Sequence, residues 1–465
     1  MIKKTFLAFI LILSILYSFS TETIITGNLP GAESLEIRLL VYSDQITYDE
    51  LVLDRKIIDK NGFFSFNIDI KEPIISFFDI EFYSFILYLE PGGKYEINCD
   101  SISIDDQYRP YYKKEHLGCK ITTDLKPGLN NLIAEFNTLY NEFVINNFDE
   151  IYKKRKRSLI DSFKKENVQK YKDIDNDYFQ DYIEYKIASI ELAGASVKKS
   201  EIFLKYLDKK PVLYHNTEYM YFFNRFFDHY LTSGSKSISR TDLLSAINYQ
   251  SSYAALMDTL GKDTILRNEV IREMVMLKGL KELYYSPDYS RQNILDILKQ
   301  VAAAGKFPEH RLIANNLIIT LTKLQKGTHT PNFKLPDLNG KMVELSELFG
   351  KPVYLSFITT WSYACLAEMK LMADLYNNYK NRIEFVSVSL DNNPEIVRKY
   401  VKDKGYEWLF LFNGSGYDLL KDYDIKTFPL FILINKEGEI LQYPAYKPSE
   451  NIETYFQALT KESDE

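Results

Sequence analysis

The chain has 465 residues and a formal net charge of -7 at pH 7. This charge provides no basic face for nucleic acid or anionic lipid, and it mainly favours solubility. With 46% hydrophobic residues the chain can bury several cores, and at roughly 150 residues per unit its length predicts about three domains.

The first twenty residues have the features of a secretory signal peptide. Lys3 and Lys4 precede a mostly apolar run over residues 6–19, and Ser18 and Ser20 occupy the minus-three and minus-one positions of a cleavage site. The run is too short for a spanning helix, and no later stretch approaches the roughly 18 apolar residues of a membrane crossing. No cysteine stands directly after this run, where cleavage would make it the lipid-accepting N-terminal residue. We therefore expect an exported, periplasmic protein whose mature chain has no membrane span.

The chain contains three cysteines, Cys99, Cys119 and Cys365. In an oxidising compartment an odd number leaves at least one thiol free or paired between chains. We predict that Cys99 and Cys119 form a structural disulfide.

Residues 21–120 are predicted to form a small β-sandwich. Phe64, Phe66, Ile68 and Ile70 alternate with polar residues after an Asn-Gly turn, a pattern typical of a half-buried antiparallel strand. Similar segments predict further strands over residues 34–42, 50–58, 76–82 and 84–89, with a last strand ending near residue 99.

Residues 121–325 are predicted to be all-α. From residue 129 onward Leu132, Phe136, Leu139 and Phe143 fall on one helix face, and comparable patterns recur to about residue 325.

Three features of these residues have plain interpretations. The basic run over residues 153–157 is expected to be a solvated helix face rather than a docking patch. The aromatic segment over residues 219–227 is expected to pack between helices rather than stack on a ligand. No two of the five histidines have the spacing of metal ligands on one helix, so neither a metal nor a cofactor is expected.

Residues 326–465 show the alternation of an α/β fold. Apolar, β-branched and aromatic runs over residues 353–358, 383–390 and 430–435 are separated by helical segments. This order predicts a central mixed sheet with helices on both faces.

Several motifs of this region occur in the order and spacing of a known family. They are Thr-Pro-Asn-Phe (330–333), Leu-Pro-Asp (335–337), Gly-Lys (340–341), Leu-Ser-Glu-Leu (345–348), Gly-Lys-Pro-Val (350–353), Thr-Trp (360–361) and the segments 385–391, 423–429 and 434–440. Together they resemble the TlpA and ResA type of exported thioredoxin-like protein. The resemblance covers about residues 326–460 and implies a thioredoxin-like fold.

In that family the motif is Cys-x-x-Cys, whereas this chain has Ser362-Tyr363-Ala364-Cys365. The first cysteine of active relatives lies at a helix N-terminus, becomes a thiolate and attacks the target disulfide, which the second cysteine then resolves. Ser362 cannot form a disulfide, and no adjacent histidine or lysine can take its proton. We expect Ser362 to be a helix N-cap.

The other site residues keep two interpretations each. Cys365 matches the resolving cysteine, and it is either a reactive thiol or a small buried side chain with an inert thiol. Glu368 corresponds to the acidic residue that tunes the thiols in ResA-like proteins, or it is an exposed first-turn carboxylate favoured by the helix dipole. Pro429 matches the family's cis-proline facing the active site, or it only maintains the fold.

A cis bond at this proline would expose the backbone of Phe428 for pairing with an extended peptide. Trp361 and Tyr363 would complete this substrate-binding surface. Thioredoxin itself has a buried proton-transfer carboxylate at the position that Ser356 occupies here. Many TlpA relatives also lack this carboxylate.

Three functions follow from these residues. The first is an envelope module that binds a peptide or protein and does not exchange dithiols. The second is a one-cysteine thiol enzyme using Cys365, since Ser362-x-x-Cys365 is similar to the peroxiredoxin Thr/Ser-x-x-Cys; however, Ile358 stands where that pattern has proline, and no arginine follows Arg398. The third is a scaffold or assembly protein. The sequence identifies neither a specific partner nor the oligomeric state.

Overall fold

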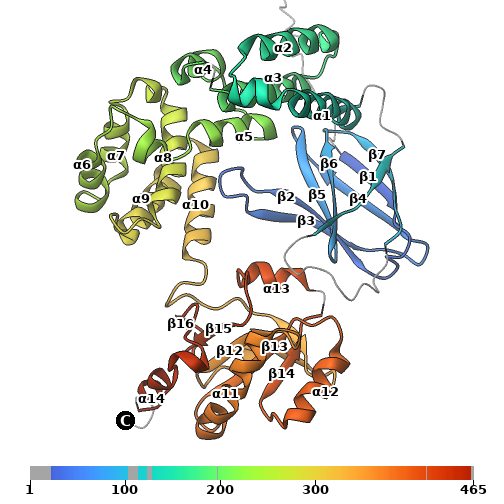
Figure 1. Cartoon of the computed structure of the whole chain (residues 1–465), viewed down its shortest axis with the longest axis vertical. Coiled ribbons are helices and arrows are strands. Elements are labelled where there is room, and N and C mark those ends of the chain that lie inside the picture. The colour runs from blue at the N-terminus through green and yellow to red at the C-terminus, as the bar shows by residue number, and fades with distance from the viewer. Residues whose placement is uncertain (1–21, 103–113, 123–127, 196, 415, 462–465) are drawn as a thin grey trace, which may run out of the picture.

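The structure is a computed structural model that describes residues 22–102, 114–122, 128–195, 197–414 and 416–461. Three units follow one another along the chain: a β-rich unit, a helical unit and an α/β unit, coloured blue, green to yellow and orange to red in Figure 1. The predicted signal peptide lies outside the described residues. Within these ranges no helix combines the length and the hydrophobicity of a bilayer crossing.

The β-rich unit consists of two facing sheets, as the alternation predicts. One has the strand order β4-β1-β7-β9 and the other β3-β2-β5-β6-β8. Both sheets contribute to a single core, in which Phe66 of the first sheet contacts Phe78 of the second, and Phe78 stacks on Phe85. The strands are β1 (Glu22–Asn28), β2 (Glu36–Tyr42), β3 (Glu50–Ile57), β4 (Phe63–Asp69), β5 (Ile74–Ile80), β6 (Tyr83–Leu89), β7 (Lys94–Cys99), β8 (Glu115–His116) and β9 (Cys119–Ile121).

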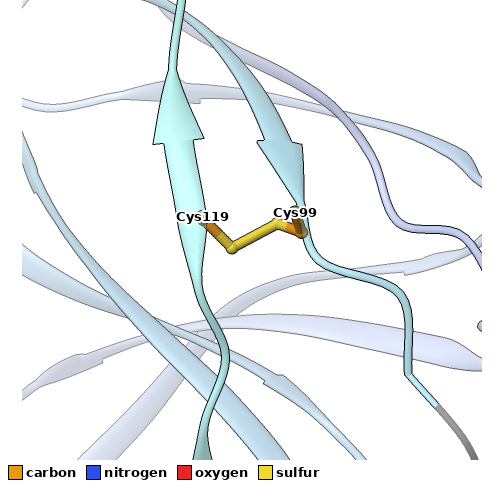
Figure 2. Close-up of a disulfide and its surroundings, with 2 residues drawn as sticks. All are labelled: Cys99 and Cys119. Carbon is orange, nitrogen blue, oxygen red and sulfur yellow. A yellow bond between two sulfur atoms is a disulfide. The ribbon is translucent and has the colours of Figure 1, made fainter.

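Cys99 and Cys119 form a disulfide that joins β7 to β9, which confirms the predicted pair (Figure 2). The two residues are directly opposite each other in the antiparallel register of these strands. The bond therefore fixes the edge strand β9 to its sheet.

The helical unit packs its apolar faces into two clusters. Most of the aromatic segment lies inside: Phe222, Phe223 and Phe226 are fully buried, which confirms packing between helices, whereas Tyr221 is exposed. The helices are α1 (Leu129–Asn146), α2 (Arg157–Tyr171), α3 (Asp177–Ala193), α4 (Lys199–Tyr206), α5 (Thr217–Phe226), α6 (Arg240–Leu244), α7 (Tyr253–Leu260), α8 (Glu269–Leu283), α9 (Arg291–Ala304) and α10 (Pro308–Thr322).

The basic run corrects one expectation. It does not form one helix face, because it joins a π turn, η1 (Asp149–Lys153), to the start of α2, and Arg155 between them has a left-handed φ of 54°. The flanking apolar spacing is helical on both sides, so the sequence pattern did not reveal the break. The run is nevertheless solvated, since Lys153 and Arg157 form only exposed ion pairs with Asp149 and Asp161.

The loop between β2 and β3 inserts into the helical unit. Ile46 at its tip belongs to the helical core. The carbonyl oxygen of Gln45 accepts a hydrogen bond from Asn224 at 2.8 Å, and the carbonyl oxygen of Ile46 accepts one from Lys281 at 2.7 Å. The loop thereby anchors the sandwich to the helices.

The α/β unit has a five-stranded sheet in the order β14-β13-β12-β15-β16. The pairs β12–β13 and β13–β14 are parallel and the pairs β12–β15 and β15–β16 antiparallel, so the predicted mixed sheet is confirmed. The strands are β12 (Val353–Ile358), β13 (Glu384–Ser389), β14 (Leu409–Phe412), β15 (Leu430–Ile434) and β16 (Ile440–Gln442), preceded by the hairpin β10 (Lys334–Pro336) and β11 (Met342–Glu344). Side chains of α11 (Tyr363–Tyr379), α12 (Pro394–Lys404) and α14 (Glu453–Lys461) pack on one face, and those of α13 (Tyr417–Asp422) on the other.

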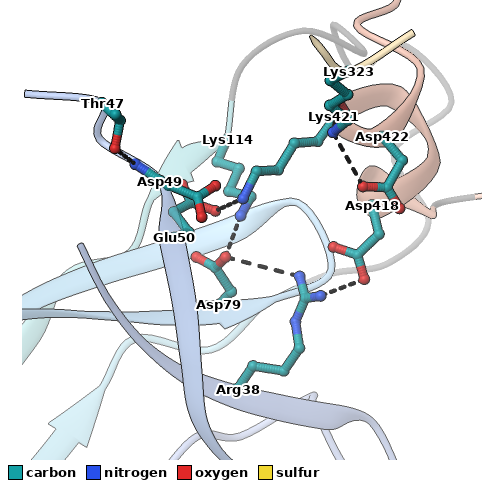
Figure 3. Close-up of polar contacts among 10 residues, drawn as sticks. All are labelled: Arg38, Thr47, Asp49, Glu50, Asp79, Lys114, Lys323, Asp418, Lys421 and Asp422. Carbon is teal, nitrogen blue, oxygen red and sulfur yellow. Dashed lines mark hydrogen bonds and ion pairs between the residues drawn. The ribbon is translucent and has the colours of Figure 1, made fainter. Parts of the chain in front are cut away.

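Ion pairs connect α13 to the β-sandwich (Figure 3). Arg38 of β2 contacts Asp418, and Lys421 lies 2.8 Å from Glu50 of β3. Although partial burial opposes its ionisation, the Arg38 guanidinium holds the pKa of Asp418 below its ordinary value. These contacts fix the α/β unit against the sandwich.

Candidate functional site

Ser362 is the N-cap of α11, as the sequence predicts. It follows β12 by a short loop, its backbone is extended, and its Oγ accepts a hydrogen bond from the Cys365 backbone N–H at 3.4 Å. A side-chain oxygen at this position satisfies one of the unpaired N–H groups at the start of a helix. The serine of the Ser-x-x-Cys motif therefore has a local structural partner.

Cys365 is completely buried, with a side-chain exposure of 0%. It lies in the core between the sheet and α11, in one cluster with Ile358 and Met369. Its Sγ is 4.0 Å from the Oγ1 of Thr359, which is also buried. In this arrangement the thiol faces the protein interior.

Asp391 organises the loop that leads into α11, and the sequence analysis did not single it out. Its buried carboxylate accepts hydrogen bonds from the Thr360 backbone N–H at 3.0 Å, the Thr360 hydroxyl at 2.7 Å and the Ser389 hydroxyl at 2.6 Å. The sequence did offer one signal, since Asp391 comes directly after the apolar run of β13. The carboxyl ends of the parallel strands β12 and β13 meet at the same edge of the sheet, which places Asp391 near the loop after β12.

Two aromatic side chains near Ser362 face solvent. Trp361 is 63% exposed and Tyr363 is 87% exposed. The Trp361 ring lies edge-on to that of Phe428, with 6.4 Å between the ring centroids and 88° between the planes. This is a favourable geometry for an aromatic pair, and it leaves part of the indole accessible.

The Phe428–Pro429 peptide bond is cis, as the resemblance implies. It precedes β15, whose residue Leu430 pairs with Phe357 near the end of β12. The antiparallel register therefore brings Phe428 and Pro429 to the sheet end from which the Trp361 loop starts.

Glu368 requires a correction. Because α11 begins at Tyr363, this residue is in the second turn of the helix and not the first. Its carboxylate accepts hydrogen bonds from the Ser449 backbone N–H at 3.0 Å and the Ser449 hydroxyl at 2.5 Å. Glu368 thus connects α11 to the 3-10 turn η6 (Pro448–Glu450), and its role in tuning a thiol stays a prediction.

Ser356, at the position of the thioredoxin carboxylate, is buried in the middle of β12. Its hydroxyl lies 2.8 Å from that of Ser387 on the neighbouring strand. Over the described ranges no group of three or more histidine, cysteine, aspartate or glutamate side chains is arranged to hold a metal ion.

Comparisons with known proteins agree on the C-terminal unit. The Redoxin family model matches residues 325–459. The thiol-disulfide oxidoreductase ResA of Bacillus thuringiensis subsp. konkukian (strain 97-27) is 31% identical over 140 residues, which are 30% of this chain and 80% of that protein. ResA of Bacillus subtilis (strain 168) is 33% identical over 131 residues, 28% of this chain and 73% of that protein. The solved thioredoxin domain of a thiol-disulfide oxidoreductase from Bacteroides vulgatus is 25% identical to this chain. The match covers 29% of this chain and 98% of the solved domain, with a TM-score of 0.28. Through its C-terminal Redoxin domain, this chain belongs to the ResA-like thiol-disulfide oxidoreductase family.

Proposed function

We propose that the Redoxin domain of this protein binds an extended polypeptide and does not carry out dithiol exchange. The observation that carries the proposal is the pair Ser362 and Cys365: the serine hydroxyl caps α11, and the thiol is fully buried behind it. Cys99 and Cys119 are bonded to each other in the sandwich. No second thiol is therefore available to Cys365.

The chemistry of exchange requires two thiols. A thiolate attacks the substrate disulfide, and a second thiol one helical turn away must resolve the mixed disulfide. The hydroxyl of Ser362 can do neither, because oxygen does not take the place of sulfur in a disulfide. The motif Ser362-Tyr363-Ala364-Cys365 is on this account a degenerate form of the family's redox motif.

A binding surface is formed by Trp361, Tyr363, Phe428 and Pro429. Large exposed aromatic side chains such as Trp361 and Tyr363 bury much area on binding at a low cost in conformational entropy. The adjacent Phe428 backbone would pair with an extended chain, and the aromatic rings would select its side chains.

The protein is proposed to act in the cell envelope after removal of residues 1–20. Its disulfide supports an oxidising compartment, where such bonds form and persist. The mature chain would consist of a β-sandwich (21–120), a helical region (121–325) and the thioredoxin-like domain (326–465), and its ligand would be a peptide or an envelope protein.

One contact favours a second candidate, a one-cysteine thiol enzyme. The Thr359 hydroxyl lies 4.0 Å from the Cys365 sulfur and gives it a polar neighbour. Such an enzyme needs its thiol to reach the substrate, so the 0% exposure of Cys365 counts against this candidate.

The experiment is a binding titration with an unfolded polypeptide whose own cysteines have been carboxymethylated, so that thiol chemistry is impossible. Fluorescence anisotropy of this labelled probe should report saturable binding to the purified protein. Trp361→Ala and Phe428→Ala should each weaken binding about 10-fold. Tyr249→Ala is the control, because Tyr249 is an aromatic residue of the helical unit, 86% exposed, that is not part of the Redoxin domain. Absence of binding, or equal affinity in all three variants, would contradict the proposal.

A further inference from the structure

A cavity of about 330 Å³ lies between the β-sandwich and the helical unit. Its walls are mostly apolar and come from β2, β5, α5 and α10; they include Val41, Tyr42, Ile74, Ile75, Met220 and Ile313. Two large apolar side chains at this cavity, Leu51 of β3 and Leu312 of α10, are 51% and 46% exposed. Apolar side chains that line a cavity and remain this exposed indicate a binding surface.

An acidic cleft of about 680 Å³ adjoins this cavity, and the two share Tyr214, His215 and Glu309. Five carboxylates line the cleft: Glu72, Glu90, Asp177, Asp181 and Glu309. Among its described lining residues there is no lysine or arginine, and the single imidazole, that of His215, lies 3.1 Å from Glu72. The lining of the cleft is therefore predominantly acidic, beside an apolar cavity.

Tyr214, in the wall between the two spaces, contacts buried polar groups of the helical unit. The Tyr214 hydroxyl is 2.8 Å from Nε2 of His310, and the His310 Nδ1 atom lies 3.3 Å from the Glu273 carboxylate. Both His310 and Glu273 are fully buried. The Tyr214 backbone oxygen also accepts a hydrogen bond from Gln45 at 3.3 Å. These contacts tie Tyr214 to both the helical unit and the loop between β2 and β3.

The charged form of the Asp181 carboxylate in the cleft is disfavoured. Burial, helped by the nearby charges of Glu184 and Asp177 and opposed by that of Lys210, raises the pKa of Asp181 to about 6. An added cation would relieve this repulsion, whereas an anionic ligand would increase it.

We propose that the cavity and the cleft form one docking groove for a basic, amphipathic polypeptide segment, in which an apolar side chain enters the cavity and neighbouring lysines or arginines face the carboxylates. The acidic cleft favours a positively charged ligand, because opposite charges attract across an interface. The apolar walls of the cavity favour a ligand that also carries an apolar side chain. The carboxylates come from the sandwich, α3 and α10, so a chain with several basic residues neutralises more of them than one small amine. This site is separate from the one on the Redoxin domain, and neither proposal depends on the other.

The test uses a short fluorescent peptide of alternating leucine and lysine and the purified protein. Two matched probes replace lysine by glutamate or leucine by serine. The Leu-Lys peptide should bind with a dissociation constant at least about 10-fold lower than either matched probe. Glu309→Gln and Leu312→Ser, three residues apart on α10, should each weaken its binding about 5-fold.

Ile319→Ser is the control variant, since Ile319 is an exposed apolar residue of the same helix α10 that does not line either space. It should leave the affinity unchanged, and circular dichroism should show all three variants folded. The proposal is overturned if the Leu-Lys peptide does not bind, if the Ser-Lys probe binds equally well, or if Glu309→Gln and Leu312→Ser behave like the control.

Discussion

The Ser362 Oγ atom accepts a hydrogen bond from the backbone N–H of Cys365 over 3.4 Å. This capping contact joins the two ends of the motif that in exchange-active relatives holds two sulfurs. The serine stabilises the start of α11, and the Cys365 side chain points into the core formed with Met369. The fold of the Redoxin domain is thus preserved around a motif with one thiol.

Ser362→Cys should restore a dithiol. A cysteine at the N-cap gains a lowered pKa from the helix N-terminus, and it would lie one turn from Cys365. We expect the variant to form a Cys-x-x-Cys disulfide under mild oxidation and to reduce insulin, whereas the wild type should not.

Ser362→Ala is the control for that change. It should remove only the cap, lower stability by about 1 kcal/mol and give no reductase activity. If the Ser362→Cys variant forms no disulfide, the geometry of the motif differs from that of an exchange site.

Asp391→Ala should loosen the loop before α11. Removal of the carboxylate leaves the Thr360 and Ser389 donors without their acceptor in a buried site, and we expect a loss of about 2 kcal/mol in urea unfolding together with weaker polypeptide binding. Glu395→Ala, an exposed carboxylate at the start of α12, should change stability by no more than about 0.5 kcal/mol. Equal effects of the two substitutions would refute a positioning role for Asp391.

The Cys99–Cys119 disulfide should contribute to the stability of the sandwich. It closes a loop with a sequence separation of 20 residues, for which chain entropy predicts about 3 kcal/mol. The Cys99→Ser/Cys119→Ser double variant should unfold earlier in denaturant, and reductant should shift the wild-type midpoint to that of the variant. A wild-type midpoint that is insensitive to reductant would count against this contribution.

Asp181 should make stability depend on pH. Its pKa in the folded protein is about 6, above the ordinary 3.8, so the folded state holds the proton more tightly than the unfolded state. Its contribution to stability is therefore present below pH 4 and is lost as the pH rises through 6. Because the group is only half-buried, we expect about 1 kcal/mol.

Asp181→Asn isolates this effect. Between pH 4 and pH 7 the wild type should lose unfolding free energy relative to the variant, as measured by chemical denaturation at each pH. Parallel pH profiles would show that Asp181 ionises normally.

Much of the fold was predictable because local patterns agree with it. The alternation of Phe64 and Phe66 identified a strand, and the apolar run over residues 353–358 identified one strand of the mixed sheet. Strands β8 and β9, of two and three residues, are too short to show a period. The break at Arg155 was hidden because helical spacing continues on both sides of it.

Contacts between segments far apart along the chain could not be predicted from a single sequence. The insertion of Ile46 into the helical core and the Arg38–Asp418 pair join residues that are far apart along the chain. Within the site, Ser362 was predictable because N-caps follow a local rule. The partners of Glu368 and Asp391 were not, since both are set by tertiary packing.

The most direct test of the central claim is the reactivity of Cys365 toward iodoacetamide across pH, in the folded protein and in denaturant, with Cys365→Ala as the blank. The account predicts that the folded protein is alkylated only after denaturation, because the thiol is buried and has no second thiol beside it. Rapid alkylation of the folded protein below about pH 7 would reveal an accessible thiolate, contradict the account and make the one-cysteine enzyme the leading function.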